Sequence, residues 1–287
     1  MSLCLYLLLL TWQDQSPFDD QNVKWNQLEY KGSLLFWKLS AQVELDRGAE
    51  RPRDLPPVTI KELDDTGNHK IILKTSAGGT KSEVWSWFDP KMGGATLGRK
   101  LSTGRQNYLK WFRFGKKQVA VQRLGPLNRK EKKKRERWSK KEFFNYQWPE
   151  SEQQSVVSET TALFYLLSAS NLEKPGDVLE LSLFAGKAYL RVSLKVERFH
   201  SLKTNYTVNN TRQKKTTETL VIRLEANPVT GMGEQSEFEL LGLEEDITVF
   251  LERQTRFPIR ISGKAPIFGG VEINLISAKM RSHPGID

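Results

Sequence analysis

Apolar and polar positions alternate along much of the chain from Leu28 onward. The clearest run, 188–196, has apolar residues at its even positions and mostly polar residues at its odd positions, and the runs 219–225, 257–263 and 271–276 repeat this period. A period of two is typical of a β-strand with one face on a core and the other in water. We therefore expect one set of side chains to be buried: Leu190, Val192, Leu194, Ile222, Leu224, Ile259, Ile261 and Leu275. The set expected to point outward, or to line a polar lumen, is Arg191, Lys195, Arg223 and Arg260.

Turn-forming sequences separate these runs from further candidate strands. The turns read DDTGN, DPKMGG, FGKK, FAGK, ANPVTGMG and APIFGG, and they are rich in the residues that tight turns favour. Further strands are predicted at 34–45, 69–75, 83–88, 108–114, 117–123, 178–184, 236–241 and 247–252. Regularly spaced strands of this kind predict an all-β fold, namely an antiparallel barrel or half-barrel with a strongly curved sheet.

One segment, Ser155–Asn171, departs from this period because its apolar residues recur at helical spacing. Ser158 is the expected N-cap, since a serine side chain accepts hydrogen bonds from the amides of a first helical turn. We expect one main helix packed against the sheet. The chain then divides into a signal-like or N-terminal segment (1–26), a single β domain (27–279) that contains a basic insertion (124–150), and a tail (280–287).

The first residues indicate export. The stretch 3–11 is mostly apolar; it is too short to span a membrane but has the length of the hydrophobic region of a secretory signal. It has no basic residue before it and no clear small-residue cleavage site after it. One explanation is a start codon assigned too late, and the alternative is an apolar segment packed on the fold. Cys4 is the single cysteine, which excludes an internal disulfide and a multi-thiolate metal site. We expect a periplasmic or outer-membrane-associated protein without a transmembrane span.

Positive charge is concentrated in one place. The chain carries a net charge of +10, and the segment 128–141, NRKEKKKRERWSKK, supplies +7 of it with nine basic and two acidic residues. It has no apolar stripe on which a helix could pack. Three interpretations remain open: a solvated insertion, a patch that docks on anionic envelope lipid or polysaccharide, and an arm for nucleic acid. Nucleic acid is the least favoured, because such proteins usually spread basic residues over a face. The docking residues would be Arg129, Lys130, Lys132, Lys133, Lys134, Arg135, Arg137, Lys140 and Lys141.

The sequence offers no constellation typical of an enzyme. The three histidines, His69, His200 and His283, lie far apart and no Cys/His cluster is present, so we predict no metal site, no cofactor and no catalytic residue. The sequence AGGTKS at 77–82 lacks the adjacent Gly-Lys of a phosphate-binding loop and is interpreted as a turn. Acidic residues at 64–65 and 244–246 fall at strand ends, where turn and cap roles are commoner than acid–base catalysis.

Aromatic residues are the best candidates for contacts with a ligand. Trp85 and Trp87 share one face of their predicted strand, and Phe112 and Phe114 share one face of theirs, with Trp111 on the other. Aromatic side chains at such positions either fill a core, which is the commoner case, or line a ligand cavity.

Three segments resemble the exported bacterial proteins grouped as domain of unknown function 3108. They are SEVWSWFDPKMGGATLGRKLSTG, SETTALFYLLSASNLEKPGDVLELSLFAGKAYLRVSLKVER and DITVFLERQTRFPIRISGKAPIFGGVEINLISA. The residues that carry the resemblance are Ser86, Phe88, Asp89, Pro90, Ala162–Leu166, Leu172, Gly176, Asp177, Gly186, Lys187, Tyr189, Leu190, Phe257, Pro258, Ile259, Gly270 and Leu275. The resemblance runs from Leu28 to Ala278, with 124–150 as an insertion. It implies an antiparallel barrel-like fold and a periplasmic or outer-envelope location, and it implies no catalytic residue.

Three functions follow as hypotheses. The leading one is a non-enzymatic envelope protein whose curved sheet, with its helix, binds a hydrophobic or polysaccharide partner. The second is an envelope scaffold or interaction protein with no small ligand, and the third is a hydrolase-like enzyme that uses acids at the mouth of the barrel. An apolar cavity lined by aromatics would favour the first, a filled barrel with an exposed patch the second, and converging carboxylates the third.

Overall fold

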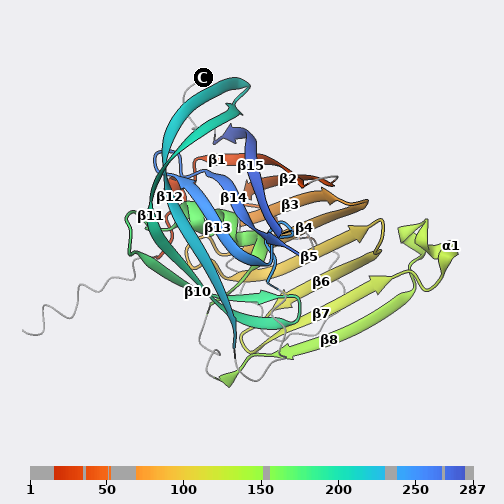
Figure 1. Ribbon diagram of the computed structural model, residues 1–287. Helices are drawn as coiled ribbons and strands as arrows, with labels where there is room; N and C mark the ends of the chain where they lie inside the picture. Colours follow the sequence, from red (N-terminus) through yellow and green to blue (C-terminus); the bar gives the residue numbers. More distant parts are fainter. Residues whose placement is uncertain are drawn as a thin grey trace, which may run out of the picture.

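The computed structural model describes residues 16–34, 37–50, 52, 69–150, 156–229, 238–266 and 269–281. In this part of the chain, 15 strands form a single sheet that curls around one main helix (Figure 1). Nearly all neighbouring strands run antiparallel, the exceptions being the β9–β10 pair and a short contact between β11 and β15. The structure thus confirms the predicted fold class, a strongly curved sheet with one main helix.

The first eight strands are β1 (Trp25–Leu34), β2 (Trp37–Arg47), β3 (His69–Ala77), β4 (Thr80–Phe88), β5 (Ala95–Thr103), β6 (Tyr108–Phe114), β7 (Gln118–Gly125) and β8 (Lys140–Gln147). The remaining strands are β9 (Val157–Glu159), β10 (Val178–Ala185), β11 (Ala188–Val208), β12 (Thr211–Pro228), β13 (Glu245–Glu252), β14 (Pro258–Ala265) and β15 (Gly269–Met280). The helical elements are η1 (Asp20–Asn22), α1 (Arg129–Lys132), η2 (Arg135–Arg137), η4 (Thr160–Ala162) and α2 (Leu163–Ala169).

Strand order across the sheet is β8-β7-β6-β5-β4-β3-β2-β1-β15-β14-β13-β12-β11-β10-β9. Most neighbours are also consecutive in the chain, because antiparallel strands can be joined by tight turns. The β3–β4 turn is one of these: Gly78 and Gly79 have φ of 54° and 79°, which confirms that AGGTKS forms a turn. The β1–β15 pair is different, because it places Leu28 opposite Ala278 and so joins two meanders in the middle of the sheet.

The core lies on the concave face of the sheet, around α2. All eight side chains expected to be buried are at most 5% exposed, and Leu194, in the middle of β11, is fully buried. On the other face of the same strands, Arg191, Lys195 and Arg223 are exposed and Arg260 is half-buried. The period of two therefore identified the core face of these strands correctly.

Helix α2 is shorter than predicted and is enclosed by the sheet. It spans Leu163–Ala169, and all seven of its residues are buried. The expected N-cap was wrong: Ser158 lies in β9 and its hydroxyl donates to the carbonyl of Gly93. The turn η4 precedes the helix, and Glu159 caps it by accepting a hydrogen bond from the Thr161 amide over 2.8 Å. The apolar spacing predicted the helix itself, but it could not show where the chain leaves the neighbouring strand.

Other differences concern strands whose sequence pattern is weak. The predicted strand at 236–241 is wrong for its described residues, where Leu240 forms only an isolated bridge with Leu243. The strands β1, β5, β8 and β9 were not among the predicted strands, and the β11–β12 hairpin is much longer than the runs that predicted it. Its tip, which projects at the top of Figure 1, turns at Asn209 and Asn210 with φ of 46° and 68°, as expected for a two-residue hairpin turn.

Candidate functional site

A cavity of about 910 Å³ opens on the concave face of β2–β6. The opposite wall consists of Glu159–Thr161, the turn between β10 and β11, and the loop 239–244. Its apolar lining comes from both walls: Leu39, Leu73, Val84, Phe112, Phe184, Leu240 and Leu241. The volume falls within the range of about 300–1,000 Å³ that is usual for small-molecule sites.

Basic side chains on adjacent strands line the same cavity. Lys100 on β5 lies directly opposite Lys110 on β6, and Lys110 lies opposite Arg123 on β7. Lys100 and Lys110 line the cavity, together with Arg105 at its exposed rim. Since residues opposite each other on neighbouring strands lie on one face, these side chains form a basic row on the concave side.

Glu159 is the acid of the cavity lining that interacts with Lys100. Its carboxylate caps η4 and interacts electrostatically with Lys100. Enclosure by the protein raises the pKa of Glu159, although its hydrogen bond with Thr161 and the nearby Lys100 oppose that shift. The other two acids that line the cavity, Glu239 and Glu244, are exposed at its rim.

The four aromatic residues predicted to contact a ligand lie on opposite faces of the sheet. Trp85 and Trp87 lie on the convex face, where their rings are 5.8 Å apart. Arg99 lies over Trp85 at 4.4 Å and over Trp111 at 5.8 Å, and it also forms an ion pair with Glu83 at 3.2 Å. A cation therefore already occupies one face of the Trp85 ring.

Phe112 and Phe114 lie on the concave face, and Phe112 lines the cavity. Both rings contact Phe184 on β10, with centroids 6.4 and 6.2 Å apart. They belong to an aromatic seam, defined here as Phe112, Phe114, Tyr146, Trp148, Phe184 and Tyr189, where the two edges of the curled sheet meet. The Tyr189 hydroxyl donates to the carbonyl of Tyr146 over 2.9 Å across this seam. Two residues of the seam, Phe112 and Phe184, also line the cavity.

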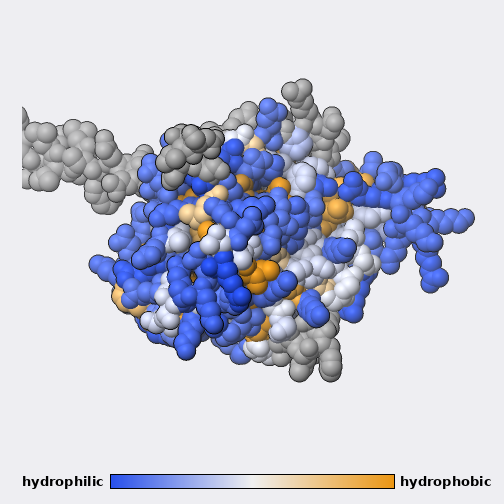
Figure 2. Space-filling model, turned by 90° about the horizontal axis from the view of Figure 1, so that it is seen from above, coloured by the Kyte–Doolittle hydropathy of each residue, from blue (hydrophilic) through white to orange (hydrophobic). Residues whose placement is uncertain are grey.

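The basic segment 128–141 forms a folded projection with exposed charges. Asn128 caps α1, and Glu131 accepts hydrogen bonds from the Leu127 amide and from the amide and hydroxyl of Ser139. These hydrogen bonds lower the pKa of Glu131. All nine basic residues are exposed, whereas Trp138 is buried. Figure 2 shows the segment as a hydrophilic projection at the right of the molecule. Strand β8 begins at Lys140, within the segment, and pairs along the whole of β7.

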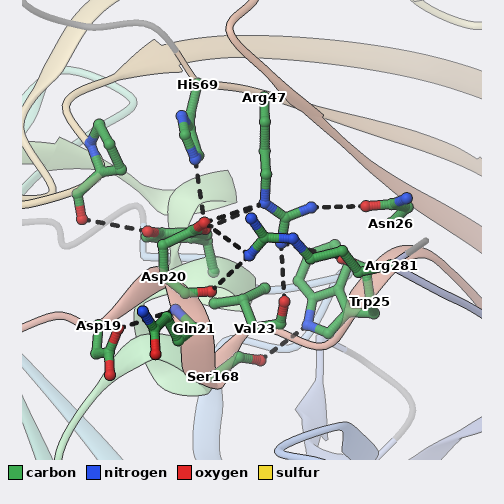
Figure 3. Close-up of polar contacts among 12 residues, drawn as sticks. Asp19, Asp20, Gln21, Val23, Trp25, Asn26, Arg47, His69, Ser168 and Arg281 are labelled. Carbon is green, nitrogen blue, oxygen red and sulfur yellow. Dashed lines mark hydrogen bonds and ion pairs between the residues drawn. The ribbon is translucent and has the colours of Figure 1, made fainter. Parts of the chain in front are cut away.

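A second polar cluster surrounds Asp20, as Figure 3 shows. Its carboxylate contacts Arg47 at 3.1 Å, His69 at 3.3 Å and Arg281 at 2.9 Å. Burial alone would raise the pKa of Asp20, but His69 and Arg47 outweigh it and hold that pKa well below its usual range. The cluster links η1, β2, β3 and the residue after β15, so it ties both ends of the described chain to the sheet.

Two further buried charges serve the fold around α2. The Arg256 guanidinium donates to the carbonyls of Leu167, Ser168, Ser170 and Leu172 at the end of the helix, where a cation is favoured. Burial lowers the pKa of Arg256 to about 10. Glu252, whose side chain is fully buried, accepts from Tyr206, Thr217 and Thr255 and pairs with Lys215 at 2.8 Å.

The sequence did not single out Lys100, Lys110, Glu159 or Arg256. Lys100 lies on a strand that was not predicted, and Lys110 on a strand with aromatic residues on both faces. A basic residue within each of ATLGRKLST and YLKWFRF was nevertheless a visible signal. Arg256 and Glu252 meet partners that are distant in sequence, which no local pattern reveals.

The described residues contain no group of three or more His, Cys, Asp or Glu side chains that could hold a metal ion. Nor does any helix among them have the length and hydrophobicity needed to cross a membrane. Residues 3–11, on which the prediction of export rests, lie outside the described part of the chain, whereas Phe18, Val23 and Trp25 are buried in the core. Comparisons of the chain with protein-family models, with curated proteins and with solved structures find no match.

Proposed function

We propose that this is a non-enzymatic binding protein of the bacterial cell envelope that holds a hydrophobic ligand in the cavity on the concave face of β2–β6. The observation that supports this most is the cavity itself, about 910 Å³ in volume and lined by apolar side chains from both walls. Pockets of this size with a few polar groups are the usual sites of small ligands. Phe112 and Phe184 of the aromatic seam form part of the lining, and a ligand would enter between β2–β6 and the loop 239–244.

The two rival functions have less support. A hydrolase needs carboxylates that converge on one point, but Glu159 caps η4 and the other two acids of the cavity lie at its exposed rim. A scaffold without a ligand would be expected to fill the space inside its curled sheet, because protein interiors are close-packed.

The basic segment 128–141 would attach the protein to anionic envelope lipid or polysaccharide. Its nine basic side chains are exposed; seven lie on the projection around α1 and η2 that stands away from the sheet, and Lys140 and Lys141 begin β8. Basic residues near an anionic membrane contribute about 1 kcal/mol each within the Debye length. The location in the envelope rests on the apolar residues 3–11 and on the resemblance to exported proteins.

Native mass spectrometry of protein purified from its own cell envelope tests the binding function. A co-purified hydrophobic ligand is expected, and its mass would identify its class. Val84→Phe, which places a larger side chain in the cavity, should abolish the added mass, whereas Lys81→Phe on the convex face of the same strand should retain it. A ligand-free native protein that also binds no added hydrophobic compound would refute the proposal.

A further inference from the structure

We propose that the cavity selects an anionic amphiphile, a ligand with one alkyl chain and an acidic head group, and that Lys100 and Lys110 hold the head. This inference rests on the proposed binding function and adds the chemical class of the ligand. The acidic head can be a carboxylate or a phosphate, because an ammonium group recognises either as a point charge.

The register of the sheet places the two lysines side by side. Val84, Lys100, Lys110 and Arg123 lie opposite one another on β4, β5, β6 and β7. Side chains in such positions have Cβ atoms about 4.5–5.5 Å apart, and like charges placed directly opposite destabilise a sheet. Arg123 is compensated by an ion pair with Glu142 at 3.1 Å. Lys100 and Lys110 both line the cavity, where an acidic head can lie between the two adjacent cations.

The convex face of the same strands shows how a structural cation is accommodated. Arg99, the neighbour of Lys100 in the chain, forms an ion pair with Glu83 and lies over two tryptophan rings. Lys100 forms no ion pair with any described residue and interacts with Glu159 only at longer range.

Apolar residues continue from the basic row on the same face. Leu73 lies opposite Val84 and extends the row away from the lysines, toward β2. Leu39, Leu240 and Leu241 complete this part of the lining. The cavity therefore combines two adjacent lysines on β5 and β6 with apolar side chains from both walls, which suits a single-chain acid better than a neutral glycan.

Competition with a fluorescent acid, 11-(dansylamino)undecanoic acid, tests the selection. Palmitate and hexadecyl phosphate should each displace this probe from the native full-length protein. Hexadecanol should compete at least about tenfold more weakly, because its neutral head cannot form a charge-assisted hydrogen bond with the lysines. Whichever acid competes better indicates the source of the head group. Inorganic phosphate alone should not compete, because it lacks the chain.

The double variant Lys100→Gln/Lys110→Gln should lose this preference and bind palmitate and hexadecanol alike. Lys116→Gln/Lys117→Gln, two exposed lysines of the β6–β7 turn, is the matched control and should keep it. Equal competition by palmitate and hexadecanol in the native protein, with both blocked by Val84→Phe, would overturn the charge selection and leave the binding function intact. Absence of binding by every compound would overturn both. The comparison in the native protein decides the matter even if the double variant does not fold.

Discussion

The guanidinium of Arg256 donates to the main-chain carbonyl of Ser170 over 2.6 Å, and so fixes the end of α2 from the turn between β13 and β14. Arg256 itself has φ of 59°, a left-handed conformation that costs an ordinary side chain about 1–2 kcal/mol. The hydrogen bonds to four carbonyls at the helix end hold this residue in place and orient the buried helix inside the sheet.

Arg256→Ala should therefore lower the free energy of unfolding by about 3 kcal/mol or more, because each buried carbonyl left without a donor costs about 1–3 kcal/mol. Urea unfolding followed by tryptophan fluorescence measures this. Arg256→Gly should be about 1 kcal/mol less destabilising than the alanine variant, since glycine relieves the positive φ. The control is Arg253→Ala in the same turn, where the side chain is exposed and paired with Glu218. A loss below about 0.5 kcal/mol, the range of ordinary surface changes, would show that Arg256 does not support the helix.

Stability should fall in acid because of Glu252. Burial by itself would raise the pKa of this carboxyl, but Lys215 and the hydroxyls of Thr217, Thr255 and Tyr206 outweigh it and lower that pKa. Its contribution is complete above the unfolded pKa of about 4.3 and is lost as the pH falls through the lower folded value.

Glu252→Gln should therefore be less stable than the native protein at neutral pH by about 1–3 kcal/mol, the cost of disrupting a buried hydrogen-bonded charge. The difference should shrink as the pH is lowered below about 4, where the native carboxyl also becomes neutral. Urea unfolding at a series of pH values measures both quantities. A difference that stays constant with pH would contradict this account of Glu252.

Leu194→Ala should destabilise the protein by about 2–5 kcal/mol, because it removes a fully buried side chain from the middle of β11. Its neighbour Lys195 is exposed on the other face, and Lys195→Ala should change stability by less than about 0.5 kcal/mol. Thermal and urea unfolding of the two variants compare the faces directly. Similar losses in both would mean that the face assignment is wrong.

The charges of the basic segment should be dispensable for folding. Deleting Arg129–Lys141 would not test the charges alone, because it would also remove the buried Trp138 and the first residues of β8. Replacing only Lys130, Lys132, Lys133, Lys134 and Arg135 by glutamine should leave the melting temperature nearly unchanged, because these side chains are exposed.

The same variant should lose salt-sensitive binding to anionic vesicles, because exposed charges act through an electrostatic field that salt screens. Co-sedimentation with phosphatidylglycerol and with phosphatidylcholine vesicles, at low and high salt, measures this. Unchanged binding to the anionic vesicles would leave the segment as a solvated projection without a docking role. A large fall in melting temperature would show that the charges are structural.

The strands that could be predicted are those with one face in water. In β11 and β15, each apolar residue such as Leu194 or Leu275 has a polar neighbour, so the local pattern determines the buried face. The strand β5 lacks that pattern because its concave face carries both Gly98 and Lys100, one against Phe112 and the other in the cavity. The candidate site was missed for the same reason, since a lysine that points inward looks like a lysine in solvent. The position of a neighbouring strand decides between the two, and only the fold supplies it.

The pairing of β1 with β15 affects the order in which this molecule can be completed. Leu28 and Ala278 are opposite each other across 250 residues of chain, whereas the strands on either side of this pair are joined largely to their sequence neighbours. A growing or translocating chain can therefore assemble two separate meanders, each with an unpaired strand edge, before β15 arrives to bridge them. Long-range pairing of this kind is slow because it must close a large loop. Until then, the central edges can pair with other chains. Refolding yield should therefore depend strongly on protein concentration. The surface of the intermediate that is open to aggregation becomes the middle of the finished sheet.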